Sequence, residues 1–257
     1  MFDQIFLIPF LTGLCLAVAL PLLGCFLRLR DEWLAALAYA HVAAAGALLA
    51  LVVGFAPTLG GMGAAALVGT SKQFFSQRVE RLAGGAAFAL LLLGGWALAV
   101  LLAANQPMAE RLGHALFDGQ LYFSGSDNLY LVLPWCLLLI PCLFWLSRQL
   151  LLARLYPDYF QARHLPVWPV VSGFDLLAAL TLALATMTLG VMGGFALVFV
   201  PPWIVFRRAH SWRQGLLLAA LIGVAGYVAA FAIALALDQP FGPVLALLLI
   251  AIGLVVA

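Results

Sequence analysis

The sequence predicts an all-α fold, a polytopic transmembrane helical bundle of about nine spans, with eight as the alternative. Of the 257 residues, 66% are hydrophobic and 9% are charged, and the apolar residues fall into long runs separated by short charged segments. Soluble domains contain about 25% charged residues, so the composition excludes an ordinary soluble protein. Almost nothing remains for a soluble domain, and residues 1–257 are expected to form a single transmembrane domain.

The spans follow from the length of the apolar runs. A hydrocarbon core about 30 Å thick requires a helix of about 20 apolar residues. The run 172–206 is too long for one such helix, and Gly190, Gly193 and Gly194 predict a tight turn between two. Runs bounded by charge, proline or glycine predict spans, in chain order, at 5–27, 33–53, 56–71, 83–104, 128–149, 172–189, 192–206, 215–237 and 241–257.

The distribution of Lys and Arg favours nine spans over eight. The segment 56–71 is short and glycine-rich, and the two counts differ in whether it crosses the membrane. If it does, eleven basic residues lie on one side and only Arg111 on the other; if it does not, the division is nine against three. Basic loops remain cytoplasmic, so nine spans place the N-terminus outside and the C-terminus inside. The eleven are Arg28, Arg30, Lys72, Arg78, Arg81, Arg148, Arg154, Arg163, Arg207, Arg208 and Arg213.

The apolar runs also predict how the helices pack. The N-terminal segment lacks the positive region of a secretory signal, so the first run is expected to remain as a helix. Small residues at four-residue spacing let helices approach closely in a bilayer. They occur on the second and third spans, at Ala36, Ala40, Ala44, Gly61, Ala65 and Gly69. The four cysteines show no CxxC spacing and are expected to be buried apolar residues: Cys15, Cys25, Cys136 and Cys142.

Catalytic and nucleotide-binding motifs are absent from the sequence. It contains no HExxH, no GxSxG, no carboxylates paired at the same depth and no GxxxxGK[ST] loop. The chain is therefore expected to be a transport subunit rather than an enzyme, to bind no cofactor itself and to bind no nucleic acid. Energy for active transport would come from a partner or from an ion gradient.

Two ionisable residues lie in or near the membrane core, where such groups are costly and often mark transport pathways. His41 lies halfway along the second span and is interpreted as a metal or proton site, or as a histidine hydrogen-bonded to a neighbouring helix. Asp175 lies a few residues into the sixth span and is interpreted as a pathway or gating residue, or as a hydrated or helix-capping carboxylate. Met187 and Met192 could be soft metal ligands, but core packing is favoured.

Two stretches of sequence resemble a known family. The first is Pro21-Leu22-Leu23-Gly24, followed by the basic turn Arg28–Arg30 and a helix bearing His41 and Gly46. The second runs from Gly190 through apolar residues to Pro201, before another basic turn. In order and spacing the chain resembles, over nearly its whole length, the permeases of metal-type ATP-binding-cassette (ABC) importers, which are the membrane subunits of zinc and manganese uptake systems. The outer segment 116–127 resembles the family's loop before its fifth span.

The resemblance implies a set of partners and a mechanism. It implies a permease of the bacterial cytoplasmic membrane that pairs with a second copy or a different permease around a central path. Two ATPase subunits would bind ATP and Mg²⁺ from the cytoplasm, and an extracytoplasmic protein would deliver the substrate. Gly190 and Pro201 are implied in gating. The cytoplasmic loop 150–171 is implied to dock on the ATPase through Pro157, Asp158, Tyr159, Phe160, Gln161, Ala162 and Arg163.

The chain departs from the family pattern at the expected metal site. Leu37 stands where the family carries an Asp one turn before the histidine, and Ala40 replaces a Ser. The glycine that follows the docking segment is missing near His164. A single imidazole is a poor site for zinc or manganese. The expected cargo is still a divalent transition metal ion, with a metal chelate or another small solute as the alternative; a gradient-driven carrier or a membrane enzyme are the rivals.

Overall fold

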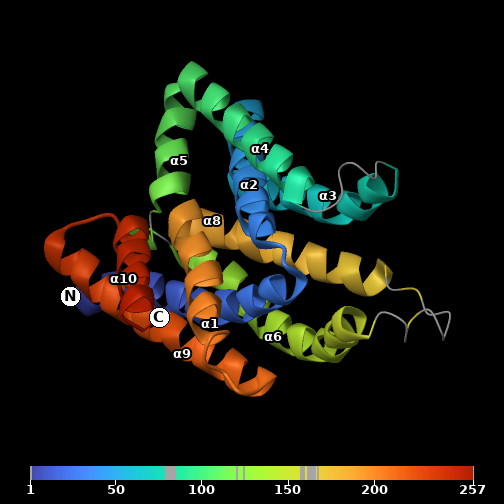
Figure 1. The fold of residues 1–257 in the computed structure, drawn as a ribbon. Coiled ribbons are helices and arrows are strands. Elements are labelled where there is room, and N and C mark those ends of the chain that lie inside the picture. The colour runs from blue at the N-terminus through green and yellow to red at the C-terminus, as the bar shows by residue number, and fades with distance from the viewer. Residues whose placement is uncertain are drawn as a thin grey trace.

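The computed structural model is helical wherever it contains regular structure (Figure 1). It describes residues 2–78, 85–119, 121–123, 125–156, 160, 166 and 168–256, without the side chains of 2–5, 72–78, 123 and 256. The elements are α1 (Phe2–Arg30), α2 (Trp33–Val53), α3 (Pro57–Arg78), α4 (Gly85–Asn105), α5 (Pro107–Asp118), η2 (Leu121–Phe123), α6 (Ser126–Leu155), α8 (Trp168–Val205), α9 (Trp212–Leu237) and α10 (Phe241–Val256).

Local sequence signals explain several helix ends. Helix α2 ends at Gly54, whose φ of 85° places it in the left-handed region that glycine adopts without strain. Helix α5 begins with Pro107, which needs no amide partner at a first helical position. Helix α9 begins after Ser211, and the Ser211 hydroxyl accepts a hydrogen bond from the Gln214 amide over 3.3 Å.

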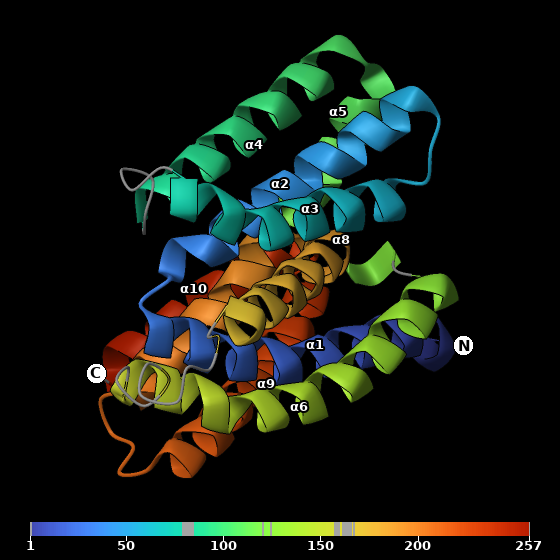
Figure 2. The same cartoon turned by 90° about the vertical axis from the view of Figure 1, so that its right-hand side faces the viewer.

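Helix α8 forms the centre of the bundle. Figures 1 and 2 show α2, α3, α4 and α5 grouped on one side of α8, with α1, α6 and α9 on the other. Helix α8 contacts helices of both groups and also α10. In the most apolar stretch of α8, 78% of the residues are buried, whereas the corresponding shares are 28% in α6 and 17% in α4. Helices α4 and α6 therefore present most of their apolar side chains outward, as helices at the edge of a membrane protein do.

The break expected near residue 190 is present. Gly190 has φ 78° and ψ 168° and interrupts the helical geometry of α8. The first arm carries Asp175, which contacts Arg30 at the end of α1. The second arm leads to Phe206, whose ring lies 5.6 Å from the Arg28 guanidinium. Both arms thus lead away from Gly190 toward the same end of α1, and α8 is a hairpin of the two predicted segments.

Small residues bring α2, α3 and α8 together, as their spacing predicted. A Cβ atom on Gly46 would lie 2.7 Å from the Gly60 carbonyl oxygen, and one on Gly60 would lie 2.6 Å from the Gly46 oxygen. Gly61 approaches the Ala43 carbonyl oxygen in the same way, and Gly69 approaches that of Asp175. No larger residue fits at these crossings without moving a backbone.

The structure adds one helix and leaves the number of spans open. Helix α5 falls where the sequence predicted only an outer loop. Six of the described helices are long and apolar enough to cross a membrane, and α8 counts once among them. Helix α3 is not one of the six, and α10 is apolar but shorter. The four cysteines are free thiols; Cys25 and Cys136 are buried, as predicted, whereas Cys15 and Cys142 are half-buried.

Candidate functional site

The orientation of the His41 ring is fixed by its own helix. His41 Nδ1 lies 2.8 Å from the carbonyl oxygen of Leu37 on α2, and the residue is 8% exposed. A carbonyl only accepts hydrogen bonds, so Nδ1 carries the hydrogen in this contact. The neutral ring therefore presents the lone pair of Nε2, the form in which histidine binds a metal ion.

Aromatic rings surround His41. The ring centroids of Phe117 on α5 and Trp96 on α4 lie 5.7 Å and 6.2 Å from that of the imidazole. Helix α4 comes close at Gly95, where a Cβ atom would lie 2.9 Å from the carbonyl carbon of His41. Among the described residues no group of three His, Cys, Asp or Glu side chains could hold a metal ion. The role of His41 as a metal ligand therefore stays a prediction.

Asp175 belongs to a buried ion pair. Its side chain is 1% exposed, and Oδ1 lies 2.9 Å from Nη1 of Arg30. Arg30 also lies 2.9 Å from a carboxylate oxygen of Glu32, and its guanidinium group sits 4.9 Å from the Phe174 ring centroid. The interpretation of Asp175 as a hydrated carboxylate is wrong, because protein atoms cover it. The pair joins the end of α1 to the first arm of α8.

Sequence reasoning missed Arg30 as the partner of Asp175. Arg30 lies in a basic turn between predicted spans, and the two residues are too far apart in sequence for any periodicity to connect them. The one available signal was energetic: a carboxylate within an apolar run is costly unless a cation neutralises it. Arg30 is the cation that the fold supplies.

Gly190 packs against Gly119, and both glycines have positive φ angles. A Cβ atom on Gly190 would lie 2.5 Å from the amide nitrogen of Gly119, which follows α5 and has φ 85°. The first residues of α10 join them, since a Cβ atom on Gly242 would lie 2.5 Å from the Asp118 carbonyl oxygen. The kink of α8, the end of α5 and the start of α10 therefore meet backbone to backbone, at the end of the bundle opposite Arg30.

Pro201 lies in the buried second arm of α8 beside a motif on α1. Pro201 and Pro202 are both buried within the helix. Pro202 has no amide hydrogen to donate to the Val198 carbonyl, which leaves that oxygen without its helical partner. Gly24 of the Pro-Leu-Leu-Gly stretch packs directly against this oxygen, and a side chain at position 24 would collide with it. The two stretches that suggested the family thus form one helix crossing.

Most of the expected ATPase-docking segment lies outside the described residues, namely Pro157, Asp158, Tyr159, Gln161, Ala162 and Arg163. Phe160 is described and is 7% exposed, so its ring is already covered by this chain. Met187 fits the packing interpretation, since it packs against Gly61, but Met192 does not, because it is 52% exposed.

Comparisons with known proteins agree on one family. The sequence model of the ABC 3 transport family matches residues 3–257. The manganese transport system membrane protein MntC of Halalkalibacterium halodurans is 25% identical over 234 residues, which cover 89% of this chain and 80% of that protein.

Two solved structures share the fold. PsaBC from Streptococcus pneumoniae in complex with Fab aligns with a TM-score of 0.83 at 17% identity, covering 98% of this chain and 91% of that one. An inward-facing transporter described as of the metal-chelate ABC type aligns with a TM-score of 0.66 at 21% identity, covering 98% and 85%. The chain belongs to the ABC 3 transport family and is a multi-pass membrane permease of that family.

Proposed function

We propose that this permease forms the membrane path of an importer for a divalent transition metal ion of the zinc and manganese class. The observation that carries the proposal is the match to the ABC 3 transport family over nearly the whole chain. The similarity to a manganese transport system membrane protein supports the choice of cargo. His41 adds a chemical reason, because its Nε2 lone pair is available for a metal ion.

The transporter contains further subunits. Two copies of this chain enclose the path, and two ATPase subunits bind ATP and Mg²⁺ beneath them, since this sequence has no phosphate-binding loop. An extracytoplasmic binding protein delivers the ion. Helix α6 extends to Leu155 and α8 begins at Trp168, so the docking loop is shorter than the predicted 150–171. This loop, with Pro157–Arg163, docks on the ATPase. Closure of the ATPases moves these loops together and switches the path between outward and inward access.

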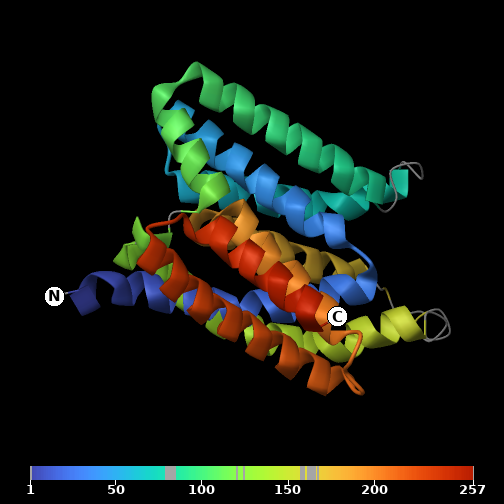
Figure 3. The same ribbon diagram turned by 60° about the vertical axis from the view of Figure 1, so that its left-hand side comes forward.

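The helices cross the bacterial cytoplasmic membrane nine times. Helix α3 runs back along α2, because Gly60 meets Gly46 midway and Gly69 meets Asp175 at the end that holds Arg30. Helix α10 starts beside Asp118 and reaches Trp203 with Gly253, so it crosses as well. Figure 3 shows α1 and α10 running in the same sense, with the N- and C-termini at opposite ends. Counting α3, α10 and both arms of α8 gives nine crossings, with the N-terminus outside.

Helix α8 supplies the moving element. Gly190 is the hinge between its arms, and Pro201 weakens the helical hydrogen bonding of the second arm. Asp175 and Arg30 clamp the first arm to α1 at the cytoplasmic end. In this arrangement Asp175 and Pro201 act in gating by holding or releasing the arms, and His41 contacts the ion.

A metal chelate is the second candidate cargo. It is favoured by the absence of any group of three metal-binding side chains among the described residues. A chelated ion brings its own ligands and needs little from His41. A free ion bound to Nε2 requires water or residues of other helices to complete its coordination shell. A single imidazole favours zinc over manganese, because manganese prefers oxygen ligands.

Uptake into vesicles that contain the complete transporter separates the two cargoes. ATP-driven uptake of zinc or manganese should be lost in His41→Ala if the imidazole is a ligand. Leu37→Asp should increase the metal retained by the purified permease, because it places a carboxylate one turn from His41 on the same helix face. Wild-type uptake by His41→Ala, with no extra metal retained by Leu37→Asp, would assign the cargo to a chelate.

A further inference from the structure

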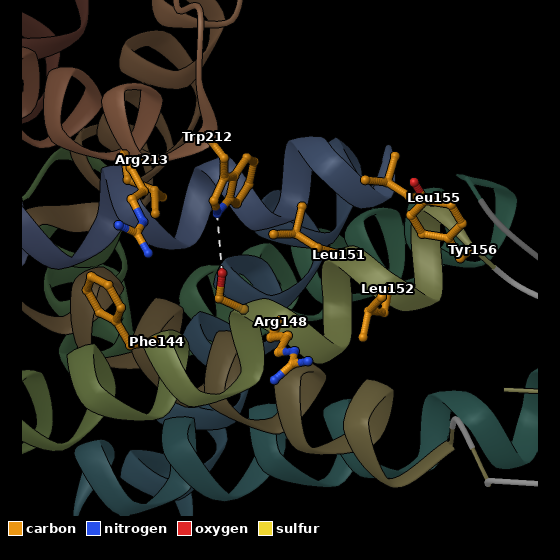
Figure 4. Close-up of a pocket in the computed structure, with 10 residues that line it drawn as sticks. Phe144, Arg148, Leu151, Leu152, Leu155, Tyr156, Trp212 and Arg213 are labelled. Carbon is orange, nitrogen blue, oxygen red and sulfur yellow. Dashed lines mark hydrogen bonds between the residues drawn. The ribbon is translucent and has the colours of Figure 1, made fainter. Parts of the chain in front are cut away.

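A groove on the outer flank of the bundle is not used by the proposed transport path. Helices α6 and α9 both pack on α1 but barely contact each other. Near the basic end of the bundle they enclose a cavity of about 460 Å³. Its rim carries Arg148 on α6 and Arg213 on α9 (Figure 4). The Trp212 indole nitrogen donates a hydrogen bond to the Ser147 hydroxyl over 3.3 Å, which links the two helices across the groove.

The groove combines two arginines with a mainly apolar lining. Leu151, Leu152, Leu155 and Leu216 line it beside the arginines. A second, much smaller recess of about 10 Å³ adjoins the groove at Phe144, Ser147 and Leu216 and also contacts Leu22 on α1 and Ile140 on α6. Ile140 and Arg148 are separated by two helical turns, or about 12 Å along the axis. On α6, apolar side chains therefore lie on both sides of Arg148 along the axis, with Phe144 one turn before it and Leu151, Leu152 and Leu155 one to two turns after it.

The charges at the rim are available to a ligand. Neither Arg148 nor Arg213 forms an ion pair with a residue that the structure describes. Helix α9 begins at Trp212, so its first-turn amide groups add positive potential beside Arg213. Trp212 and Tyr156 add amphipathic aromatic side chains of the kind found at the membrane surface. An anionic headgroup would complement this end of the groove.

The flanking side chains face the hydrocarbon. Phe144 is 66% exposed on α6 and Leu217 is 67% exposed on α9, and both belong to helices that are apolar enough to cross a membrane. A water-soluble partner is excluded here, because it would have to enter the hydrocarbon layer to reach Phe144 and Leu217. A second copy in the same membrane would bring its own basic end toward the two arginines, which like charges oppose. A lipid satisfies both the two arginines and the exposed apolar side chains.

From this combination we infer that the groove between α6 and α9 is a binding site for one anionic phospholipid. Its phosphate lies between Arg148 and Arg213, and an acyl chain lies over the exposed apolar side chains that flank the groove, beside Phe144 and Leu217. Basic pockets between membrane helices at the cytoplasmic face bind anionic headgroups in this manner. The site is independent of the metal path, and its function is to hold the splayed ends of α6 and α9 at a fixed separation beside the segment that leads to the docking loop.

Native mass spectrometry of the detergent-purified permease tests this site. Phosphatidylglycerol should bind at one tight site, and phosphatidylcholine with the same acyl chains should not. The variant Arg148→Gln/Arg213→Gln should bind phosphatidylglycerol about tenfold or more weakly, since each basic residue near an anionic lipid contributes roughly 1 kcal/mol. The matched control is Arg154→Gln, which removes an exposed arginine of the same helix that does not line the groove, and it should bind as the wild type does.

Three results would overturn the inference. They are equal binding of the two lipids, unchanged binding by the double variant, and displacement of phosphatidylglycerol by inorganic phosphate, which would indicate a simple anion site. A photo-crosslinker at Tyr156, which lines the groove, gives a second readout in intact membranes. It should label phospholipid, whereas a crosslink to an ATPase subunit or to a second copy would assign the groove to that protein.

Discussion

Asp175 shows how much one residue contributes when it is buried and charged. Its carboxylate is 1% exposed and depends on Arg30, 2.9 Å away, for neutralisation. Asp175→Asn leaves the guanidinium group with Glu32 as the remaining carboxylate of the cluster. Because Glu32 still neutralises the guanidinium group, we expect a loss of about 1–3 kcal/mol in unfolding free energy, the cost of a buried donor that loses its partner, which is less than the roughly 3–5 kcal/mol of a fully uncompensated buried charge. Thermal or denaturant unfolding of the purified permease measures it.

Asp31→Asn is the matched control for this prediction. It makes the same substitution next to Arg30, but Asp31 is exposed, and its φ of 59° is one that asparagine also adopts. Its stability should equal that of the wild type. If Asp175→Asn is as stable as this control and loses only transport, Asp175 acts in the pathway and the ion pair is not a structural clamp.

At the scale of elements, the predicted break in α8 depends on a single backbone conformation. Gly190→Ala places a Cβ atom at a φ of 78° and 2.5 Å from the Gly119 amide nitrogen. Both the strain and the contact should force α8 away from the end of α5, and the variant should be destabilised or fail to assemble. Gly119→Ala should behave in the same way, because it collides with the Leu189 carbonyl oxygen.

Gly94→Ala provides the comparison for the Gly190 substitution. Gly94 lies within α4 and is exposed, and no neighbouring atom lies within 4 Å of the place that its Cβ atom would occupy. Alanine favours a helix over glycine by roughly 0.5–1 kcal/mol, so this variant should be as stable as the wild type or slightly more stable. The stability of all three variants is measured by expression level and melting temperature. If Gly190→Ala is as stable as Gly94→Ala, the close packing of Gly190 on Gly119 does not stabilise the fold.

The docking segment is a second element that can be tested separately. Replacing Tyr159 and Phe160 with Ala should reduce co-purification with the ATPase about tenfold or more, the loss expected when interface anchors are truncated. Phe160 is already buried in this chain, so Phe160→Ala alone must be measured for stability. Tyr159→Ala in a protein of unchanged stability isolates the contact. Undiminished co-purification by that variant would place the ATPase contact elsewhere.

The elements also show which features a sequence pattern reveals. Gly190 was predictable because the run 172–206 exceeds the length of one span and glycine marks its centre. Helix α5 was missed because it has only 12 residues and includes Glu110, Arg111 and His114, so it looks like a polar loop. The signal that could have revealed it is its amphipathic spacing, since the buried Ala109, Gly113 and Leu116 repeat at helical intervals on the face that packs against α4 and α8.

At the scale of the whole molecule, the sequence predicts where the helices form better than it predicts which residues of distant helices contact each other. The helical fold and the close approach of α2 and α3 follow from apolar run length and small-residue spacing, which are local properties. The pairing of Arg30 with Asp175 and the contact of Gly24 with Val198 require α1 to lie beside both arms of α8. Only the tertiary arrangement brings these residues together, so neither contact could be read from spacing along the chain.

The last prediction concerns the path of the whole chain through the membrane. In the nine-crossing arrangement, cysteines at Arg78, Arg154 and His210 should react with a membrane-impermeant maleimide only from the cytoplasm. Ala56 and Asp118 are exposed at the other end of the bundle, and cysteines there should react only from outside. The unsubstituted chain gives the background of its four native thiols, which lie within membrane helices. Position 56 decides between the two topologies, because α3 connects it to Arg78. If both positions are labelled from the same side, α3 does not cross the membrane and the number of spans is eight. Opposite sidedness of positions 56 and 78 is expected, because Gly60 and Gly69 contact α2 and α8 at different depths along the bundle.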